Sequence, residues 1–264
     1  AGVDVLDLWT LSIEDELEPD GYERCTTAVT NGGRLVAHNE DWSADAKEDV
    51  CLIRKTIGAT TTLELYYYAC PLGGAAFSVR GDGYVQAINS LQATDRQIGV
   101  PRTVIARRLS EITGGGEEIR RVLGLARASG YAHVIGDAAG VVLALECTGT
   151  RFAMTRPALP FVHTNHALAA ELHGLADDDD TGTSRQRYDL ARALVGADMQ
   201  VDALKDAFGR KRGKYRGLFN KNTIARVIFD RSEGRLSVWL RREKALGFVD
   251  YPIAPLGGGP RDVA

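Results

Sequence analysis

The chain has 264 residues, of which 44% are hydrophobic and 25% charged, and its formal net charge at pH 7 is −3. These values are ordinary for a soluble globular protein with a sizeable core. They show no general bias toward nucleic acid or an anionic membrane. No apolar run reaches the ~18 residues of a membrane-spanning helix, and the first ten residues lack the features of a signal peptide.

The four cysteines form no C-x-x-C pair and fit no zinc-ribbon spacing. In a chain of this length they do not indicate a disulfide scaffold. We interpret them as reduced thiols of a cytoplasmic protein, two or three of which are small buried hydrophobic residues. They are Cys25, Cys51, Cys70 and Cys147.

The first third of the chain consists mainly of expected strands, separated by turn signals rich in glycine, asparagine and aspartate. After a strand-like run that begins at Cys25, we expect strands at 34–42, 50–57, 62–70, 75–81 and 84–91. Two helices follow. The first, at 101–112, begins at a proline, and the second, at 117–127, has acidic residues in its first turn.

The second half of the chain returns to strands, which we expect at 131–138, 141–148, 151–157, 161–166, 223–230 and 235–242. A helix at 185–196, with Ser184 as its N-cap, separates the last two from the others. Hairpins with helices grouped between them indicate an α+β architecture of layers. No repeat or long linker is visible, so we expect a single domain over residues 1–264.

Three other segments have simple explanations. The acidic run 177–180 is typical of a solvated loop. The Thr-Gly-Gly-Gly segment at 113–116 lacks the lysine and hydroxyl residue of a phosphate-binding loop, so a helix–helix linker is favoured over an anion cradle. A basic stretch could hold a phosphate-bearing tail such as that of coenzyme A, although a solvated loop is favoured. This stretch comprises Arg210, Lys211, Arg212, Lys214 and Arg216.

Cys25 is the first candidate for chemistry. Taken alone, a cysteine that opens a strand is more often structural than reactive. A nucleophile needs a base for its proton and donors for the developing oxyanion. The nearest histidine is His38, at the end of the next strand. If the chain is cut before Cys25, the new α-amine, which titrates near about pH 8 in peptides, supplies a base on the same residue.

The stretch Cys-Thr-Thr-Ala-Val-Thr-Asn-Gly-Gly-Arg-Leu-Val-Ala-His-Asn-Glu-Asp-Trp at 25–42 resembles the start of the mature β-chain in a known family. This is the acyl-coenzyme A:isopenicillin N acyltransferase family, which belongs to the cysteine N-terminal nucleophile hydrolases. A second motif, Phe-Val-His-Thr-Asn-His at 161–166, is similar to the strand end of that family. The resemblance extends from about residue 3 to 245.

The resemblance implies a four-layer αββα sandwich and a role for each matching residue. Cys25 resembles the nucleophile whose α-amine is the base, and Thr27 the strand residue that supports it. Asp41 resembles the aspartate that orients or charge-stabilises the amine. Asn165 resembles the asparagine that donates to the oxyanion.

The resemblance also implies self-processing into two pieces. Residues 25–264 would be the mature β-subunit, and residues 1–24, of which 3–17 reads as a helix, a short α-subunit or propeptide. The family usually places glycine before the nucleophile. In this chain Arg24 stands there, and its side chain would slow an N-to-S acyl shift.

The sequence therefore predicts a self-processing enzyme that hydrolyses or transfers the acyl group of a small N-acyl amide through a Cys25 thioester. Penicillin-type side chains, β-alanyl amides and peptidyl amides all remain open as substrates. We expect no metal and no cofactor, with acyl-coenzyme A as a possible co-substrate. His163 and His166, which have no acidic or cysteine partner at ligand spacing, could pack around Asn165.

Two alternatives stay open. The chain could be a non-catalytic binding scaffold in which Arg24 still caps Cys25. It could also be a Cys/His hydrolase that uses His163 or His38 as its base.

Overall fold

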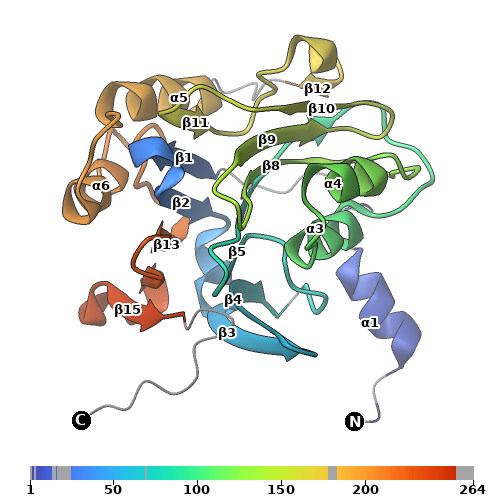
Figure 1. The fold of residues 1–264 in the computed structure, drawn as a ribbon, viewed down its shortest axis with the longest axis horizontal. Helices are drawn as coiled ribbons and strands as arrows, with labels where there is room; N and C mark the ends of the chain where they lie inside the picture. The colour runs from blue at the N-terminus through green and yellow to red at the C-terminus, as the bar shows by residue number, and fades with distance from the viewer. Residues whose placement is uncertain are drawn as a thin grey trace.

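The computed structural model describes residues 4–13, 25–68, 70–177 and 183–253, together with Gly2 and Glu16. Two large antiparallel sheets dominate it (Figure 1). The first sheet contains, in spatial order, β11 (Phe161–His163), β1 (Thr26–Thr30), β2 (Leu35–Asp41), β13 (Thr223–Asp230), β14 (Arg235–Leu240) and β15 (Val249–Pro252).

The second sheet contains seven strands. In spatial order they are β10 (Phe152–Thr155), β9 (Val142–Cys147), β8 (Tyr131–Gly136), β6 (Val85–Ser90), β5 (Phe77–Arg80), β4 (Thr60–Tyr67) and β3 (Val50–Ile57). A short ribbon pairs β7 (Gln92–Ala93) with β12 (Ala176–Asp177).

The helices lie mainly on the outer faces of the sheets (Figure 1). They are α1 (Val5–Ser12), α3 (Arg102–Ser110), α4 (Gly115–Leu123), α5 (Thr183–Leu194) and α6 (Val201–Phe208). Short 3₁₀ turns occur at η1 (Asn31–Gly33), η2 (Ala44–Glu48), η3 (Ala170–Leu172) and η4 (Arg241–Leu246).

Three apolar clusters hold four layers together. One lies between the two sheets and includes Val29, Val36 and Phe77. A second packs α5 and α6 on the outer face of the first sheet. A third packs α3 and α4 on the outer face of the second sheet. The predicted αββα sandwich is thus confirmed, because each sheet buries one face against the other sheet and one against helices.

The β1–β2 hairpin sets the register at the start of the first sheet. Thr26 pairs with Asn39, and Thr27 with His38. The turn needs left-handed backbone at three consecutive residues, which explains Asn-Gly-Gly: φ is +54° at Asn31, +63° at Gly32 and +95° at Gly33. A Cβ on Gly33 would lie 2.9 Å from a methyl group of Val142, so the turn also brings the two sheets close together.

The inter-sheet layer changes character along the strands. Side chains on one face of a strand alternate with period two, so every second residue points into this layer. At one end these residues are apolar and belong to the cluster between the sheets. At the other end they are polar and buried, namely Cys25, Thr27, His38, Glu40, Asn89, Glu146 and His163.

Several elements differ from the sequence-based prediction. Helix α6 and strands β7, β12 and β15 were not predicted, and most strands are shorter than expected. The N-cap prediction for Ser184 is wrong: α5 begins at Thr183, and the Ser184 hydroxyl binds the Thr164–His166 loop instead. The Thr-Gly-Gly-Gly segment is a linker that runs into α4, and Glu118 accepts hydrogen bonds from the amides of Thr113 and Gly114 there.

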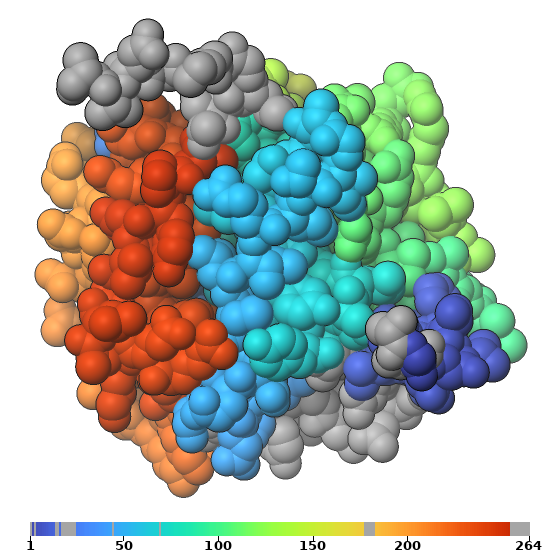
Figure 2. Space-filling view, turned by 90° about the horizontal axis from the view of Figure 1, so that it is seen from below, coloured from blue at the N-terminus to red at the C-terminus, as the bar shows by residue number. Residues whose placement is uncertain are grey.

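The N-terminal segment packs on the second-sheet side of the molecule, where α1 occupies a corner in the view from below (Figure 2). The Asp4 side chain caps α1 by accepting from the Leu6 amide at 2.7 Å. The rest of the expected 3–17 helix and the Arg24 side of the expected cut lie outside the described residues, apart from Glu16. Among the described residues, no helix combines the length and apolar character needed to cross a membrane.

His133 on β8 gives a test of the fold. It is buried, and neither ring nitrogen has a hydrogen-bond partner among the residues that the structure describes. Burial lowers its pKa to about 3, whereas an unfolded histidine titrates near about 6.5. Because the unfolded chain takes up this proton first, acidification from pH 7 to 4.5 should cost about 2–3 kcal/mol through His133 alone.

We predict that His133→Leu narrows the difference in unfolding free energy between pH 7 and 4.5 by about that amount, measured by urea denaturation. The exposed His173→Leu is the matched control and should leave the difference unchanged. An unaltered difference in His133→Leu would show that His133 is protonated in the folded protein.

Candidate active site

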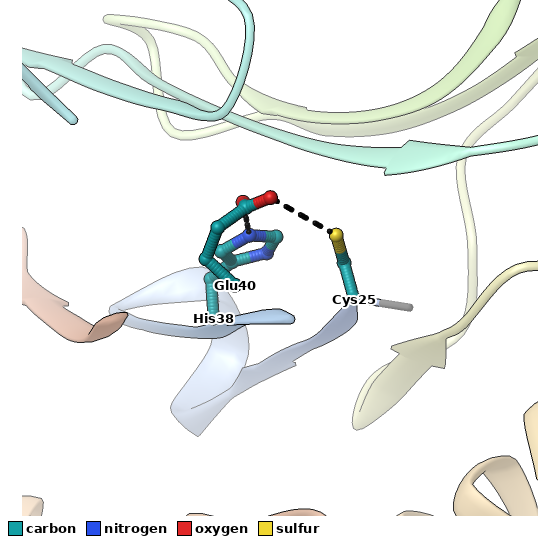
Figure 3. A group of neighbouring side chains, drawn as sticks. All are labelled: Cys25, His38 and Glu40. Carbon is teal, nitrogen blue, oxygen red and sulfur yellow. Dashed lines mark hydrogen bonds and ion pairs between the residues drawn. The ribbon is translucent and has the colours of Figure 1, made fainter. Parts of the chain in front are cut away.

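Cys25 lies immediately before β1, with only 2% of its surface exposed. Its thiol donates to Glu40 Oε1, with 3.4 Å between sulfur and oxygen (Figure 3). The hairpin register accounts for this contact. Thr26 lies opposite Asn39, so Cys25 comes opposite Glu40, and both side chains point into the inter-sheet layer.

A chain of hydrogen bonds continues from Glu40. Its other oxygen, Oε2, lies 2.7 Å from His38 Nε2, and His38 Nδ1 lies 2.8 Å from the Thr27 hydroxyl. Thr27 donates in turn to Asn89 Oδ1 at 2.7 Å. The ligand atoms of Cys25, His38 and Glu40 lie within 4.8 Å of one another, close enough to surround an ion. The three groups nevertheless satisfy one another through hydrogen bonds.

Arg187 on α5 joins Cys25 to the second motif. Its side chain is fully buried. Nη1 donates to the Cys25 carbonyl oxygen at 2.6 Å and to the Thr26 hydroxyl at 2.9 Å, and Nη2 donates to Asn165 Oδ1 at 2.8 Å. One rigid guanidinium therefore fixes both the backbone of the cysteine and the amide of the asparagine.

Asn165 is held in one orientation by its neighbours. Its side-chain nitrogen donates to the Ser90 carbonyl oxygen at 3.1 Å, and its backbone amide donates to the Ser184 hydroxyl at 2.9 Å. An amide nitrogen carries two hydrogens. With Oδ1 bound to Arg187, the nitrogen keeps a second hydrogen that can be donated to a reacting oxygen.

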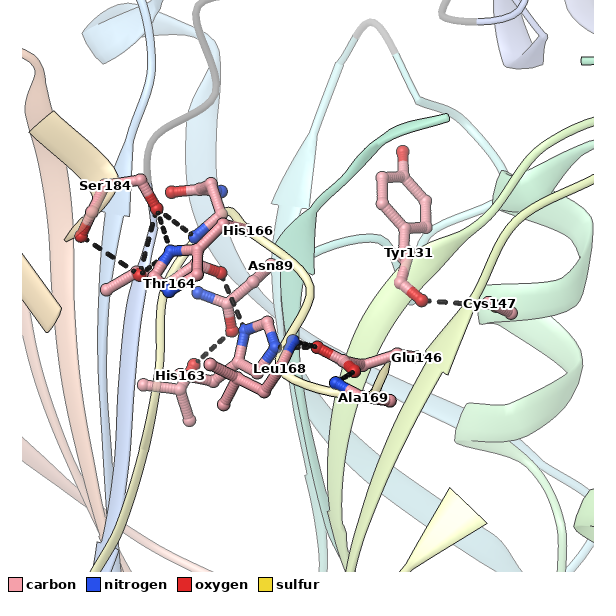
Figure 4. Close-up of polar contacts among 12 residues, drawn as sticks. Asn89, Tyr131, Glu146, Cys147, His163, Thr164, His166, Leu168, Ala169 and Ser184 are labelled. Atoms are coloured by element: carbon pink, nitrogen blue, oxygen red, sulfur yellow. Dashed lines mark hydrogen bonds and ion pairs between the residues drawn. The ribbon is translucent and has the colours of Figure 1, made fainter. Parts of the chain in front are cut away.

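His163 and His166, which stand on either side of Asn165 in the sequence, bind different partners (Figure 4). His163 Nε2 lies 2.7 Å from Glu146 Oε1, and His166 Nδ1 lies 2.8 Å from the Ser184 hydroxyl. Burial alone would raise the pKa of Glu146, but His163 and the amides of Leu168 and Ala169 hold that pKa below its usual range.

This arrangement fixes the loop after Asn165. A cavity of about 540 Å³ lies beside the loop, and its lining includes His166, Leu168, His173, Arg185 and Tyr188.

Asp41 lies one residue beyond Glu40, so on a regular strand its side chain points to the opposite face of the sheet, toward the helices. Asn220 donates to its Oδ2 at 2.5 Å. Burial raises the pKa of Asp41 to about 6, while Arg187 and hydrogen bonds from Thr223 and Asn220 act in the opposite direction. The four predicted residues thus lie around one strand end, and the carboxylate in contact with the thiol is that of Glu40. Asp41's role stays a prediction.

Sequence reasoning missed Arg187, Glu40 and Asn89. The side-chain nitrogen of Asn89 is buried and has no hydrogen-bond partner within the described part of the chain, so it is an unused donor on the wall of the site. Arg187 and Asn89 gave no local signal, but the period-two pattern of the hairpin could have indicated Glu40.

The basic stretch 210–216 is mostly exposed, which agrees with a solvated loop. Binding of a coenzyme A tail there, the less favoured alternative, is untested.

Comparison with known proteins identifies the family. Residues 29–245 match the model of the acyl-coenzyme A:6-aminopenicillanic acid acyl-transferase family, a span that includes Asp41 and Asn165 and begins just after Cys25. The chain belongs to this family. It is therefore an enzyme of the cysteine N-terminal nucleophile class, whose members are amide hydrolases and acyltransferases.

Solved structures share the fold at low sequence identity. A mutant of the conjugated bile acid hydrolase of Clostridium perfringens has a TM-score of 0.60 and 10% identity, covering 90% of this chain and 95% of that one. Penicillin V acylase of Agrobacterium tumefaciens has a TM-score of 0.55 and 11% identity, covering 82% and 83%. No curated protein matches this chain in sequence.

The raised pKa of Asp41 predicts an unusual pH dependence. An unfolded aspartate titrates near about 4. Between about pH 4 and pH 6 the unfolded chain loses the Asp41 proton while the folded chain keeps it. The free energy of unfolding therefore falls as the pH rises, by about 3 kcal/mol in total.

Asp41→Asn removes this pH-dependent contribution to the free energy of unfolding. In a Cys25→Ala background, which should stay uncut, the variant should gain stability relative to its parent from pH 4 to 7.5, as measured by urea denaturation. The exposed Asp49→Asn should show no such trend. A parallel pH dependence of Asp41→Asn and its parent would mean that Asp41 has an ordinary pKa.

Proposed function

We propose that the protein cuts its own chain between Arg24 and Cys25 and then breaks the amide bond of a small N-acyl compound through a Cys25 thioester. The observation that carries this proposal is Arg187, whose guanidinium binds the Cys25 carbonyl oxygen and Asn165 Oδ1 together. It brings a buried thiol and a side-chain amide donor to one strand end, in a family of cysteine nucleophiles.

In the proposed mechanism the free α-amine of Cys25 takes the thiol proton. The thiolate attacks the substrate carbonyl carbon, and the developing oxyanion receives a hydrogen bond from Asn165 Nδ2. Asn89 Nδ2 is available as a second donor. The tetrahedral intermediate collapses to the thioester, and the ammonium returns its proton to the leaving amine. Water or another amine then takes the acyl group.

The N-terminal segment has contacts that would hold it in place after a cut. The Thr103 hydroxyl donates to the Ser12 carbonyl oxygen at 2.7 Å. The Glu16 carboxylate accepts from the Arg102 amide at 2.6 Å and from the Ser129 hydroxyl at 2.7 Å and 2.9 Å. These contacts support residues 1–24 as a short subunit bound beside α3.

The proposed substrate class rests on the relatives and on a cavity next to the Asn165 loop, whose lining includes His166 and Leu168 but neither Cys25 nor Asn165. The cavity beside the Asn165 loop, of about 540 Å³, can enclose a drug-sized molecule. Two proteins of the same fold are named for conjugated bile acids and penicillin V, both small amides. We propose a small N-acyl amide as substrate.

One observation favours a second candidate, a Cys/His hydrolase that works without a cut. His38 reaches the thiol through Glu40, so a base is already present in the uncut chain. His163 is less suited to this role, because Glu146 and the Thr164 carbonyl oxygen occupy both its nitrogens. The two candidates differ in whether the active protein has a new N-terminus at Cys25.

We predict that Cys25→Ala abolishes both self-cleavage and turnover, because the nucleophile and its base belong to one residue. Intact mass under denaturing conditions should show two fragments for the wild-type chain and one for the variant, and a panel of N-acyl amides should report activity. The half-buried Cys51→Ser is the control and should keep both properties. A wild-type preparation that is active but uncut would instead support the Cys/His hydrolase.

We predict that Asn165→Ala lowers kcat by about 100–1,000-fold with little change in KM, because the donor acts where charge develops. The rates are to be measured on cut protein. Ser184→Ala removes the hydroxyl that binds the Asn165 backbone but leaves the side-chain donor, and it should cost less than about tenfold. Equal losses in the two variants would argue against Asn165 as the oxyanion donor.

A further inference from the structure

The first self-cleavage poses a chemical problem that later turnovers do not. Before the cut, the Cys25 nitrogen belongs to a peptide bond, and resonance delocalises its lone pair into the carbonyl group. It therefore cannot take the thiol proton, although the thiol must lose that proton to become a strong nucleophile. Another base has to act once, in the uncut chain.

The structure places a carboxylate at the thiol. Glu40 Oε1 accepts the hydrogen bond from the Cys25 sulfur at 3.4 Å, and no more than 4% of the side chain of either Glu40 or His38 is exposed. Figure 3 shows the Glu40 carboxylate over the imidazole of His38, with one oxygen directed toward the ring and the other toward the sulfur of Cys25. The proton acceptor is thus within hydrogen-bond reach of the proton that it would take.

The hydrogen bonds around His38 define what Glu40 can do. Thr27 has one hydroxyl proton, which it donates to Asn89 Oδ1, so it accepts from His38 Nδ1–H. His38 therefore presents Nε2 to Glu40 Oε2 at 2.7 Å, and a proton must lie between these two atoms. Glu40 Oε1 remains as the acceptor that faces the thiol.

Apolar packing does not explain why Glu40 and His38 are buried together. The next inward-facing residues on the same strands are Val29 and Val36, which belong to the apolar cluster. Burying a carboxylate and an imidazole costs desolvation energy that apolar side chains would not incur. Buried ionisable pairs of this kind are therefore candidates for a functional role.

We infer that Glu40, oriented by His38, is the base of the self-cleavage step alone, an inference that rests on the proposed self-processing. Glu40 Oε1 takes the thiol proton, and the Cys25 sulfur forms a bond to the Arg24 carbonyl carbon. The carbon–nitrogen bond then breaks, and Glu40 returns the proton to the departing nitrogen, which becomes the free α-amine. Water hydrolyses the thioester, leaving a carboxylate on Arg24 and a thiol on Cys25.

Once the α-amine of Cys25 is free, it replaces Glu40 as the base for the thiol of the same residue. Glu40 is then a catalytic residue of activation, and His38 is a positioning residue that acts through it. We therefore expect substitutions of Glu40 or His38 to slow self-cleavage much more than substrate turnover. Substitution of Cys25 should abolish both.

The test compares self-cleavage with turnover in the same variants. Each chain is made in two forms. One is the full-length sequence. The other is full-length with the residues directly before Cys25 replaced by the recognition sequence of a site-specific protease that leaves Cys25 as the new N-terminus. Intact mass over time gives the self-cleavage rate of the first form, and N-acyl amide assays give kcat and KM of the protease-cut second form.

We predict that Glu40→Gln, which keeps the shape and removes the base, slows self-cleavage by about 100-fold or more. It should lower kcat of the protease-cut form by less than tenfold. His38→Gln should show the same split with a smaller loss of self-cleavage. Glu64→Gln is the matched control, because Glu64 is also a buried glutamate but is paired with Lys55, and it should slow self-cleavage by less than tenfold.

Self-cleavage of Glu40→Gln at the wild-type rate would overturn the inference. Equal losses of self-cleavage and turnover, in variants with wild-type melting temperatures, would also overturn it, because Glu40 would then serve both steps. A wild-type chain that stays uncut, while its protease-cut form is active, would overturn self-processing and the base together but leave the Cys25 amidase intact.

Discussion

The buried guanidinium of Arg187 is the interaction on which the site depends. It spans from the carbonyl oxygen of Cys25, at the start of the first sheet, to the side chain of Asn165, in the loop after β11. Leaving such a charge in the interior without its acceptors would cost several kcal/mol. The arginine therefore constrains the strand, the loop and helix α5 to one arrangement, and it fixes the positions of the proposed catalytic groups, Cys25 and Asn165, relative to each other.

Two residues in sequence, Glu40 and Asp41, lie in different electrostatic environments because they point to opposite faces of one strand. Glu40 faces the inter-sheet layer and meets the thiol and an imidazole. On the other face of a regular strand, Asp41 is bound by Asn220 and lies in the field of Arg187. Strand alternation thus places two neighbouring carboxylates in different surroundings.

Much of this architecture could be predicted from the chain. The Asn-Gly-Gly turn and the alternation around it specify the first hairpin, and the two motifs locate Cys25 and Asn165. Arg187 could not be found in this way, since it is remote in sequence from both its partners. Ser184 looks like a helix cap locally, but a tertiary contact takes its hydroxyl. Helix α6 and the edge strand β15 were missed, and β15 is short and half-exposed, with weak local patterning.

The inter-sheet layer changes from apolar to polar along the strands. It therefore keeps the packing that stabilises the fold apart from the groups of the candidate site. Hydrophobic packing joins the sheets at one end, where Val29, Val36 and Phe77 meet. The other end carries polar groups that form a network of their own. Exchanges at the polar end can therefore alter chemistry while the apolar end continues to hold the sandwich closed. Over evolutionary time, substitutions in the polar network can therefore change the reaction of such an enzyme without a change in its fold.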